Sequence, residues 1–349
     1  MSLRVWKKEL TFKTTDVTAL TSLTPSFLVT GNSLGRVHGW DLNTGDEMIE
    51  FYSIIKTSHI TNIVALTDHT FVTGDRHGMV IVWDNTKRKQ GFAHSLELKG
   101  HKHCITCIIK LTDTTFVTGS YDNTIRVWNV SDWEGAISTK FEKHANTAMC
   151  AVRLTDESCV TGSWNNDVQV RDFKAGTLLE LCAHTNSVKC VDKLTETLIV
   201  SGSCDGTIRV WDITRSKSLH LVDGDEGKSS LGLNGHTGGV DCVVAINKEV
   251  FVTASDDTTL RVWNLDNKTS RELKGHCWPV SCLAKMSENI LVSGDIGCSL
   301  RVWDPLHDES SVELTGHTRP VMFLIVLSRT SFVSASDKEM IMWSAIEML

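Results

Sequence analysis

A stretch of thirty residues, 100–129, recurs along the chain and limits what the chain can fold into. It reads GHKHCITCIIKLTDTTFVTGSYDNTIRVWN: a Gly-His start, three short strand-like runs, and a polar turn between the second and third. The tryptophan that ends the third run recurs, with arginine in its place once, at Trp40, Trp83, Trp128, Arg171, Trp211, Trp263, Trp303 and Trp343. These positions are spaced 43, 45, 43, 40, 52, 40 and 40 residues apart. Such a period is typical of repeat architectures, in which each unit packs on its neighbours.

The start of the unit recurs with the same regularity. A histidine is followed 17 residues later by a hydroxyl side chain in six pairs: His101 and Thr118, His144 and Thr161, His184 and Ser201, His236 and Thr253, His276 and Ser293, His317 and Ser334. By the same spacing, the histidine positions of the first two units hold Lys13 and Lys56. The one long interval contains a polar insert around residues 221–230, which we interpret as an exposed loop.

The coincidence of a Gly-His start, a turn aspartate, a Trp-Asp end and a fixed period makes the chain resemble WD40-repeat β-propellers. A single Gly-His or Trp-Asp dipeptide would be a weak signal, but the resemblance covers essentially all 349 residues. It implies an all-β fold and one domain, residues 1–349, forming a single closed β-propeller of four-stranded antiparallel blades. The repeat count predicts eight blades, with seven as the alternative.

The two ends of the chain are predicted to share the last blade. Only six residues follow Trp343, so the eighth unit lacks its fourth strand. Residues 8–13 align with residues 271–276, which begin with such a fourth strand. An N-terminal strand that completes the last blade would leave no unpaired sheet edge.

Composition excludes several other classes of protein. The net charge is −7, from 35 Lys and Arg against 42 Asp and Glu, which argues against a surface that tracks nucleic-acid phosphates. The start of the chain has no signal-peptide pattern, and no apolar run could span a bilayer. We therefore expect a cytoplasmic protein, with the nucleus as the alternative, that binds neither nucleic acid nor membrane.

The eleven cysteines are expected to be reduced. Five of them lie six residues after the histidine position, which indicates small core side chains: Cys107, Cys150, Cys190, Cys242 and Cys282. His101, His103, Cys104 and Cys107 look like half of a zinc site, but no second Cys-x-x-Cys exists to complete four ligands. We expect no metal and no cofactor.

Three units carry a complete polar set, which the resemblance implies is a buried hydrogen-bonded chain from indole to hydroxyl to imidazole to turn carboxylate. The sets are His101, Thr118, Asp122 and Trp128; His184, Ser201, Asp205 and Trp211; His236, Thr253, Asp257 and Trp263. Buried indole, hydroxyl and imidazole groups each need a partner, and a linked network supplies one to all of them.

Other units depart from this set. Blade four has Asn165 and Arg171, blade seven has Gly297 at the position of the aspartate, and the turn of blade eight is one residue short. Blade seven is therefore expected to open more readily than blade three. Ser, His and Asp are also the residue types of a hydrolase triad, but a set repeated with tryptophan attached is better explained as structure. We expect no catalytic residues and no enzyme activity.

The resemblance also implies where partners bind: on the top face, at three and five residues after the histidine position and at the residue before the turn aspartate. The partner-binding candidates are Arg76, Tyr121, Met149, Trp164, Lys189, Asp241 and Asp256. Tyr121 and Trp164 are large aromatics at a turn position that the network does not need, and such residues dominate interfaces.

The resulting prediction is a non-catalytic scaffold or adaptor, a monomer that binds other proteins or peptide segments. A ubiquitin-ligase substrate receptor is the alternative, weakened because a phosphopeptide reader would need several arginines on the top face, where this chain has Arg76 and Lys189. An enzyme built on a propeller is the alternative from another class. It would need one unrepeated polar cluster, and the sequence shows none.

Overall fold

The computed structural model of the protein describes residues 5–51, 58–89, 92–133, 136–141, 146–214, 230–307 and 311–346. Lys56, His144 and residues 221–229 of the polar insert lie outside the described residues. The described strands form eight four-stranded antiparallel sheets, so the predictions of an all-β fold and of eight blades are confirmed. By contacts, the chain divides into two compact units: Met149–Leu324, the middle unit, and Arg4–Ala148 with Ile325–Leu349, the outer unit.

The outer unit contains blades one, two, three and eight. Blade one has β2 (Val17–Thr24), β3 (Phe27–Asn32), β4 (Val37–Asp41) and β5 (Glu47–Phe51); blade two has β6 (Ile60–Ala65), β7 (Thr70–Asp75), β8 (Val80–Lys89) and β9 (Phe92–Leu98). Blade three has β10 (Ile105–Lys110), β11 (Thr115–Ser120), β12 (Ile125–Asn129) and β13 (Ile137–Phe141); blade eight has β30 (Phe323–Val326), β31 (Ser331–Ala335), β32 (Glu339–Ile346) and β1 (Val5–Lys13). Each strand pairs with the next along the chain, except in blade eight.

The middle unit contains blades four to seven. Blade four has β14 (Ala148–Thr155), β15 (Ser158–Ser163), β16 (Asp167–Asp172) and β17 (Thr177–Cys182); blade five has β18 (Val188–Lys193), β19 (Leu198–Ser203), β20 (Ile208–Asp212) and β21 (Ser230–Leu233). Blade six has β22 (Val240–Ala245), β23 (Val250–Ser255), β24 (Leu260–Asn264) and β25 (Thr269–Leu273); blade seven has β26 (Val280–Ser287), β27 (Ile290–Asp295), β28 (Leu300–Trp303) and β29 (Ser311–Leu314).

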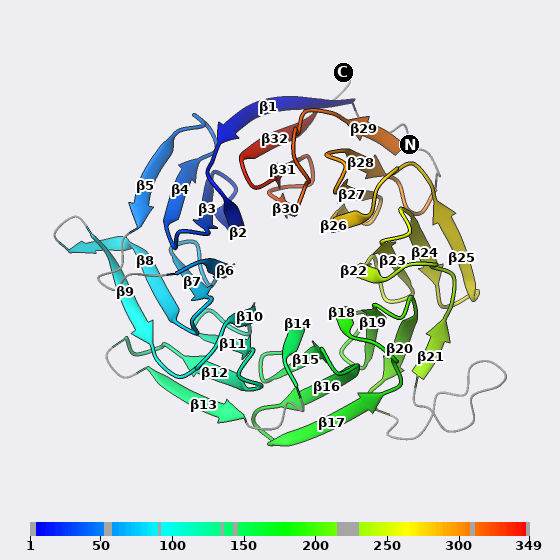
Figure 1. Cartoon of the computed structure of the whole chain (residues 1–349), viewed down its shortest axis with the longest axis horizontal. Helices are drawn as coiled ribbons and strands as arrows, with labels where there is room; N and C mark the ends of the chain where they lie inside the picture. The colour runs from blue at the N-terminus through cyan, green and yellow to red at the C-terminus, as the bar shows by residue number, and fades with distance from the viewer. Residues whose placement is uncertain are drawn as a thin grey trace. The chain divides into compact units, whose positions relative to one another are not determined.

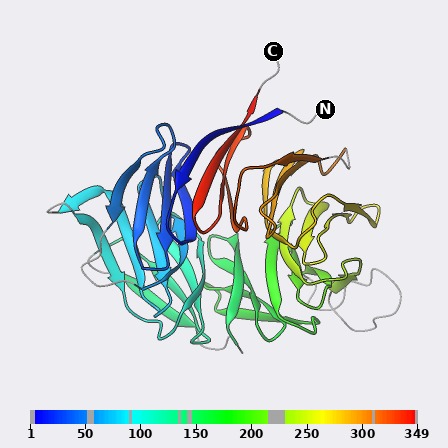
Figure 2. The ribbon, with the colours of Figure 1, turned by 45° about the horizontal axis from the view of Figure 1, so that its top comes forward.

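The N-terminal strand completes the last blade, as predicted. β1 pairs antiparallel with β32 from Val5 opposite Ile346 to Lys13 opposite Glu339. Figures 1 and 2 show the two strands, from opposite ends of the sequence, side by side. Two aromatic side chains of β1 are buried, Trp6 against Phe332 and Phe12 against Trp40 of blade one. The strand thus supplies both hydrogen bonds and core to the outer unit.

Neighbouring blades within each unit pack through their first two strands. β6 packs against β2 and β10 in the outer unit, and β22 against β18 and β26 in the middle unit. The glycine of the second strand makes this approach tight: a Cβ atom at Gly202 would lie 2.5 Å from Val240 of the next blade and 2.7 Å from Cys190 Sγ. The valines and isoleucines of the second and third strands are almost all fully buried, which explains the strand-like runs of the sequence.

Candidate functional site

Blades three, five and six contain the same buried polar chain. In blade five, Trp211 Nε1 donates to Ser201 Oγ at 2.9 Å, Ser201 Oγ lies 2.7 Å from His184 Nε2, and His184 Nδ1 lies 3.2 Å from Asp205 Oδ2. Thr207 adds a hydroxyl donor to the other carboxylate oxygen, at 2.6 Å. The corresponding contacts in blades three and six are made by His101, Thr118, Asp122 and Trp128, and by His236, Thr253, Asp257 and Trp263.

The donors and acceptors of this polar chain fix the direction of each of its hydrogen bonds in blade five. The indole can only donate, so Ser201 Oγ accepts from Trp211 and its own proton is left to donate to His184 Nε2. His184 therefore carries its proton on Nδ1, which donates to the carboxylate of Asp205. The backbone N–H of Thr185 donates to the same oxygen at 2.8 Å. The network is satisfied with a neutral imidazole and an ionised carboxylate.

The electrostatics agree with this assignment. Burial lowers the pKa of His184 to about 4, more than the nearby Asp205 carboxylate raises it. Burial raises the pKa of Asp205, but hydrogen bonds from Thr207, the backbone N–H of Thr185 and the charge of His184 outweigh it and bring the pKa to about 2. The pKa values of His101 and His236 are lowered too, mainly by burial. These imidazoles stay neutral at neutral pH.

This arrangement predicts a loss of stability in mild acid. His184 binds a proton in the unfolded chain near its ordinary pKa of 6.5, but in the folded protein its pKa is only about 4. The unfolded state therefore binds more protons as the pH falls through this window, and the stability contributed by neutral His184 is lost from about pH 6.5 down to about pH 4. The urea midpoint should fall as the pH is lowered through this window. A midpoint that stays constant in the wild type, or falls as steeply in His184→Asn, would contradict the assignment.

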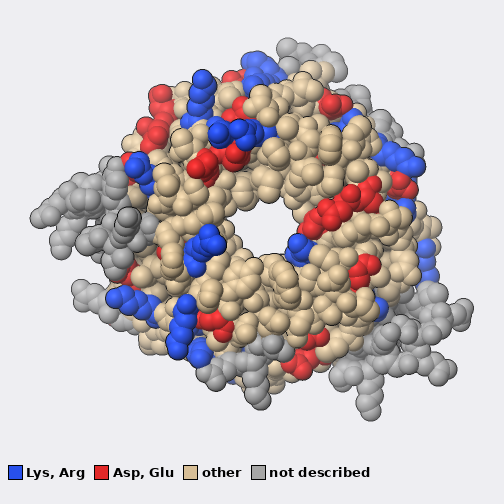
Figure 3. All heavy atoms as spheres, viewed as in Figure 1, with Lys and Arg blue, Asp and Glu red and all other residues tan. Residues whose placement is uncertain are grey.

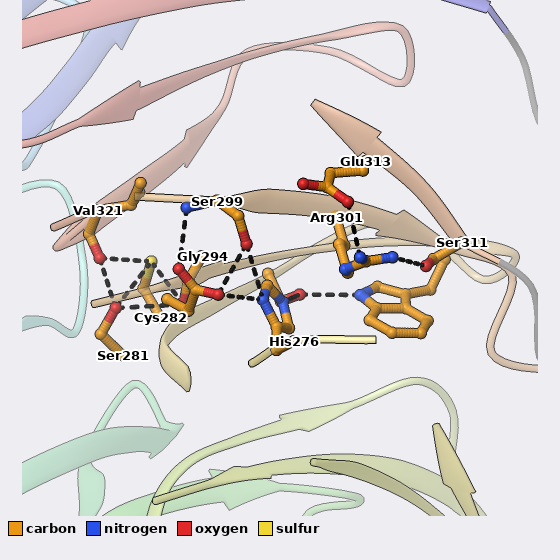
Figure 4. Close-up of polar contacts among 12 residues, drawn as sticks. His276, Ser281, Cys282, Gly294, Ser299, Arg301, Ser311, Glu313 and Val321 are labelled. Carbon is orange, nitrogen blue, oxygen red and sulfur yellow. Dashed lines mark hydrogen bonds and ion pairs between the residues drawn. The ribbon is translucent and has the colours of Figure 1, made fainter. Parts of the chain in front are cut away.

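Blade seven corrects the sequence prediction. Gly297 occupies the regular aspartate position, but the network is complete because Asp295, two residues earlier, takes over the role. His276 Nδ1 lies 2.7 Å from Asp295 Oδ2 and His276 Nε2 lies 2.6 Å from Ser293 Oγ, while Ser299 donates to the carboxylate. Figure 4 shows Ser299 beside His276, with a dashed line between the two side chains. The expectation that blade seven lacks a carboxylate was wrong. Because its network is complete, there is no reason to expect this blade to open more readily than blade three.

A glycine at position 297 makes space for a neighbouring side chain. A Cβ atom there would lie 2.0 Å from Cδ1 of Trp278, so the indole of Trp278 lies directly over the turn. An aspartate at the regular position would displace this ring. Trp278 is 56% exposed and was not among the predicted partner-binding residues. A tryptophan two residues after the histidine, together with a glycine at the aspartate position, was the signal that could have found it.

The remaining blades keep parts of the network. Blades one, two and eight each retain the indole-to-hydroxyl hydrogen bond at 2.9 Å, in the pairs Trp40 and Thr30, Trp83 and Thr73, and Trp343 and Ser334. In blade four Arg171 is buried at the tryptophan position, and this burial lowers the pKa of its guanidinium. At this position, blade four therefore has a buried guanidinium in place of the buried indole of the other blades.

The hydrogen-bonded sets offer no accessible nucleophile. The hydroxyl residues Thr118, Ser201 and Thr253 are 0% exposed, and each hydroxyl is held between an indole and an imidazole. A hydrolase nucleophile must reach its substrate. These sets are therefore structural.

The zinc half-site is not assembled among the described residues. His101 belongs to the network, and Cys107 is buried beside Gly119 with its pKa raised to about 11, mainly by burial. Across the described ranges, no group of three or more His, Cys, Asp or Glu residues is placed to hold a metal ion. The same ranges contain no helix that could span a membrane.

The predicted partner positions meet at one end of each blade. In blade three the N–H of Tyr121, before the turn aspartate, donates to the carbonyl of Cys104, three residues after the histidine. The same bond joins Arg76 to His59, Cys204 to Ser187, Asp256 to Gly239 and Ile296 to Pro279 in blades two, five, six and seven. We call this end of the blades, with its turn residues and the starts of the first strands, the turn face.

The position five residues after the histidine has a structural use in half of the blades. There a hydroxyl donates to a backbone carbonyl at the start of the next blade: Thr18 to Ile60 at 2.6 Å, Thr61 to Ile105 at 2.7 Å, Thr106 to Ala148 at 2.5 Å, and Ser281 to Val321. Figure 4 shows this clamp at Ser281. Four blades lack the clamp hydroxyl and carry Met149, Lys189, Asp241 and Met322 instead. These four residues all lie within Met149–Leu324, the middle unit.

On the outer unit, Arg76 and Tyr121 both lie near Cys104. The charge of Arg76 acts on the Cys104 thiol, although burial dominates and raises the pKa of that thiol. Tyr121 is 44% exposed and its ring makes an edge contact with His103. The structure thus brings the predicted residues of blades two and three together around one cysteine.

On the middle unit, Lys189, Asp241 and Asp256 lie close together. Burial raises the pKa of Asp241 to about 6, the charge of Asp256 and a hydrogen bond that protonated Asp241 donates to it add to this shift, and Lys189 opposes it. Trp164 is 54% exposed on the turn of blade four, and Met149 at the start of that blade is half-buried. Met322, 47% exposed, follows Val321, whose N–H donates to the carbonyl of Asp295.

Comparison with known proteins agrees with this geometry. The family model "WD domain, G-beta repeat" (WD40) matches residues 93–129, 176–212, 227–264 and 267–304. The chain therefore contains WD40 repeats, and WD40 β-propellers are typically interaction scaffolds and not enzymes. A solved structure, that of the computationally designed Ika8 protein, is similar with a TM-score of 0.79 and 25% identity over 95% of this chain and 96% of that chain. A comparison with curated proteins finds no match.

Proposed function

We propose that this protein is a non-catalytic scaffold that binds protein or peptide segments on the turn face of its blades. The observation that carries the proposal is that the turn face of the middle unit departs from the repeat and places large apolar side chains in solvent. Trp164, Trp278 and Met322 are each about half exposed. Single exposed apolar residues are ordinary, but exposed tryptophans are enriched in binding sites.

The loss of the clamp hydroxyl in four blades also supports binding on the turn face. In blades one, two, three and seven the hydroxyl five residues after the histidine ties one blade to the next. The fold does not require it in blades four, five, six and eight, where Met149, Lys189, Asp241 and Met322 stand. Positions released from a structural role are the ones that can be used for contacts with a partner.

The charges favour a protein partner over nucleic acid. Figure 3 shows Lys and Arg side chains interspersed with Asp and Glu on the face drawn, with most of the surface between them uncharged. On the middle unit, Lys189 lies beside two carboxyls, Asp241 and Asp256. A phosphopeptide reader would need several unopposed cations at one place, so the ubiquitin-ligase receptor of that kind gains no support here.

Alanine variants test the proposal. Trp164→Ala and Trp278→Ala should each weaken capture of the bound proteins by about 10-fold or more, because truncating a central aromatic anchor typically costs at least about 1–2 kcal/mol. The measurement is quantitative mass spectrometry of proteins captured by each variant. Ile137→Ala is the matched control, since Ile137 is 69% exposed but lies in β13, a fourth strand away from the turn face. Equal capture by all three variants would place the partner surface elsewhere.

A further inference from the structure

Blade one has a polar cavity near its turn. The cavity has a volume of about 100 Å³, and its lining includes Lys13, Thr14, Thr30, Asn32, Trp40 and Glu47. Trp40 Nε1 donates to Thr30 Oγ1 at 2.9 Å, as in the complete blades. In those blades the hydroxyl then donates to a histidine, 17 residues earlier in the chain, but here that position holds Lys13, which is exposed.

Asn32 occupies the position that Asp295 occupies in blade seven, two residues after the hydroxyl. In blade seven, Asp295 Oδ1 accepts the turn N–H of Ser299, and Oδ2 accepts from His276. In blade one, Asn32 Oδ1 accepts the turn N–H groups of Leu34 and Arg36 at 3.0 and 2.9 Å. These two bonds fix the orientation of the amide, so its nitrogen Nδ2 takes the place of Asp295 Oδ2.

The cavity is therefore lined by donors where blade seven presents an acceptor. Asn32 is 3% exposed, and its Nδ2 is buried without a hydrogen-bond partner, as is Thr14 Oγ1. Thr30 Oγ1 accepts from the indole, which leaves its proton free to donate. Lys13 adds a cation at the lining, and the carboxylate of Glu47 is engaged with His38 Nδ1 at 2.7 Å.

This donor set selects the chemistry of the ligand. Buried N–H and O–H groups without partners are costly, so a ligand that accepts from them gains the hydrogen bonds without breaking others. An imidazole offers one acceptor nitrogen, and its N–H would face the N–H of Asn32. A carboxylate offers two acceptor oxygens and a charge opposite to that of Lys13.

We propose that blade one binds a small monocarboxylate of the size of acetate, between the Asn32 amide, the Thr30 and Thr14 hydroxyls and Lys13. The cavity admits only a few heavy atoms, so the affinity is weak, with a Kd of about 1–10 mM. The site lies in blade one of the outer unit, and its lining includes none of the proposed partner-binding residues.

An NMR titration of the full chain with acetate tests the site. The indole N–H of Trp40 and the side-chain amide of Asn32 should shift saturably with sodium acetate, and imidazole or sodium chloride at equal concentration should not shift them. Thr14→Val, which keeps the shape of the side chain and removes the hydroxyl, should weaken acetate binding about 3- to 10-fold. Ser33→Ala, at a half-buried neighbouring hydroxyl that donates to Asp16 and lies outside the cavity lining, is the control and should leave binding unchanged.

Asn32→Asp provides a switch of specificity. The aspartate keeps an Oδ1 for Leu34 and Arg36 and presents Oδ2 to the cavity, as Asp295 does to His276 in blade seven. This variant should bind imidazole at least about 10-fold more tightly than acetate. The absence of a saturable acetate shift in the wild type, or the same ligand preference in wild type and Asn32→Asp, would overturn the proposal.

Discussion

Removing strand β1 by deleting residues 1–12 should lower the thermal midpoint by at least about 10 °C and promote aggregation. The deletion exposes the edge of β32, whose backbone pairs with β1 along its whole length. It also removes Trp6 from its contact with Phe332, at 5.3 Å between ring centroids, and Phe12 from Trp40, at 6.0 Å. Burial of two such side chains contributes about 3–6 kcal/mol, before the hydrogen bonds are considered.

A single substitution separates the core contribution from the loss of the strand. Phe12 is 2% exposed, so Phe12→Ala should reduce the free energy of unfolding by about 3–5 kcal/mol. The adjacent Thr11 points to the exposed side of the same strand, and Thr11→Ala should have little effect. The measurement is urea denaturation of the wild type, Phe12→Ala and Thr11→Ala. If the deletion variant melts at the wild-type temperature, β1 does not contribute to the stability of blade eight.

The sequence was sufficient for the fold because the repeat carries several independent signals at fixed spacing. The recurring tryptophan, with Arg171 in its place once, identified each blade, and the alignment of residues 8–13 with a fourth strand located β1. Because every repeat forms a blade with the same kind of core, the strands assigned in one repeat predict those of the others.

The candidate site was only partly predictable, because a spacing rule cannot show a role that has moved. Blade seven kept its carboxylate but shifted it to Asp295, and Gly297 then made space for Trp278. The position five residues after the histidine, Thr106 in blade three, was predicted to contact a partner. Its structural role was missed because the carbonyl that accepts from its hydroxyl lies at the start of the next blade. Both features depend on contacts between segments that no pattern within one repeat contains.

Asp295→Ala should lower the free energy of unfolding by about 3–4 kcal/mol, the second large effect expected in this chain. Asp295 is 1% exposed and accepts from His276, from the hydroxyl of Ser299 and from the N–H of Ser299. Its removal takes the carboxylate acceptor away from the buried imidazole N–H and from both donors of Ser299. Asp266→Ala, at an exposed turn aspartate of blade six, is the control and should change the stability by less than about 0.5 kcal/mol.

Restoring the regular register tests why the carboxylate moved. The double variant Asp295→Ser with Gly297→Asp recreates the arrangement of blades three, five and six, but its new side chain meets the indole of Trp278, 2.0 Å from the position of the Cβ atom. The double variant should therefore be about as unstable as Asp295→Ala, and the addition of Trp278→Ala should recover most of the loss. Urea denaturation measures both steps. Full stability of the double variant with Trp278 in place would show that the ring moves aside freely and that Gly297 is not needed to accommodate it.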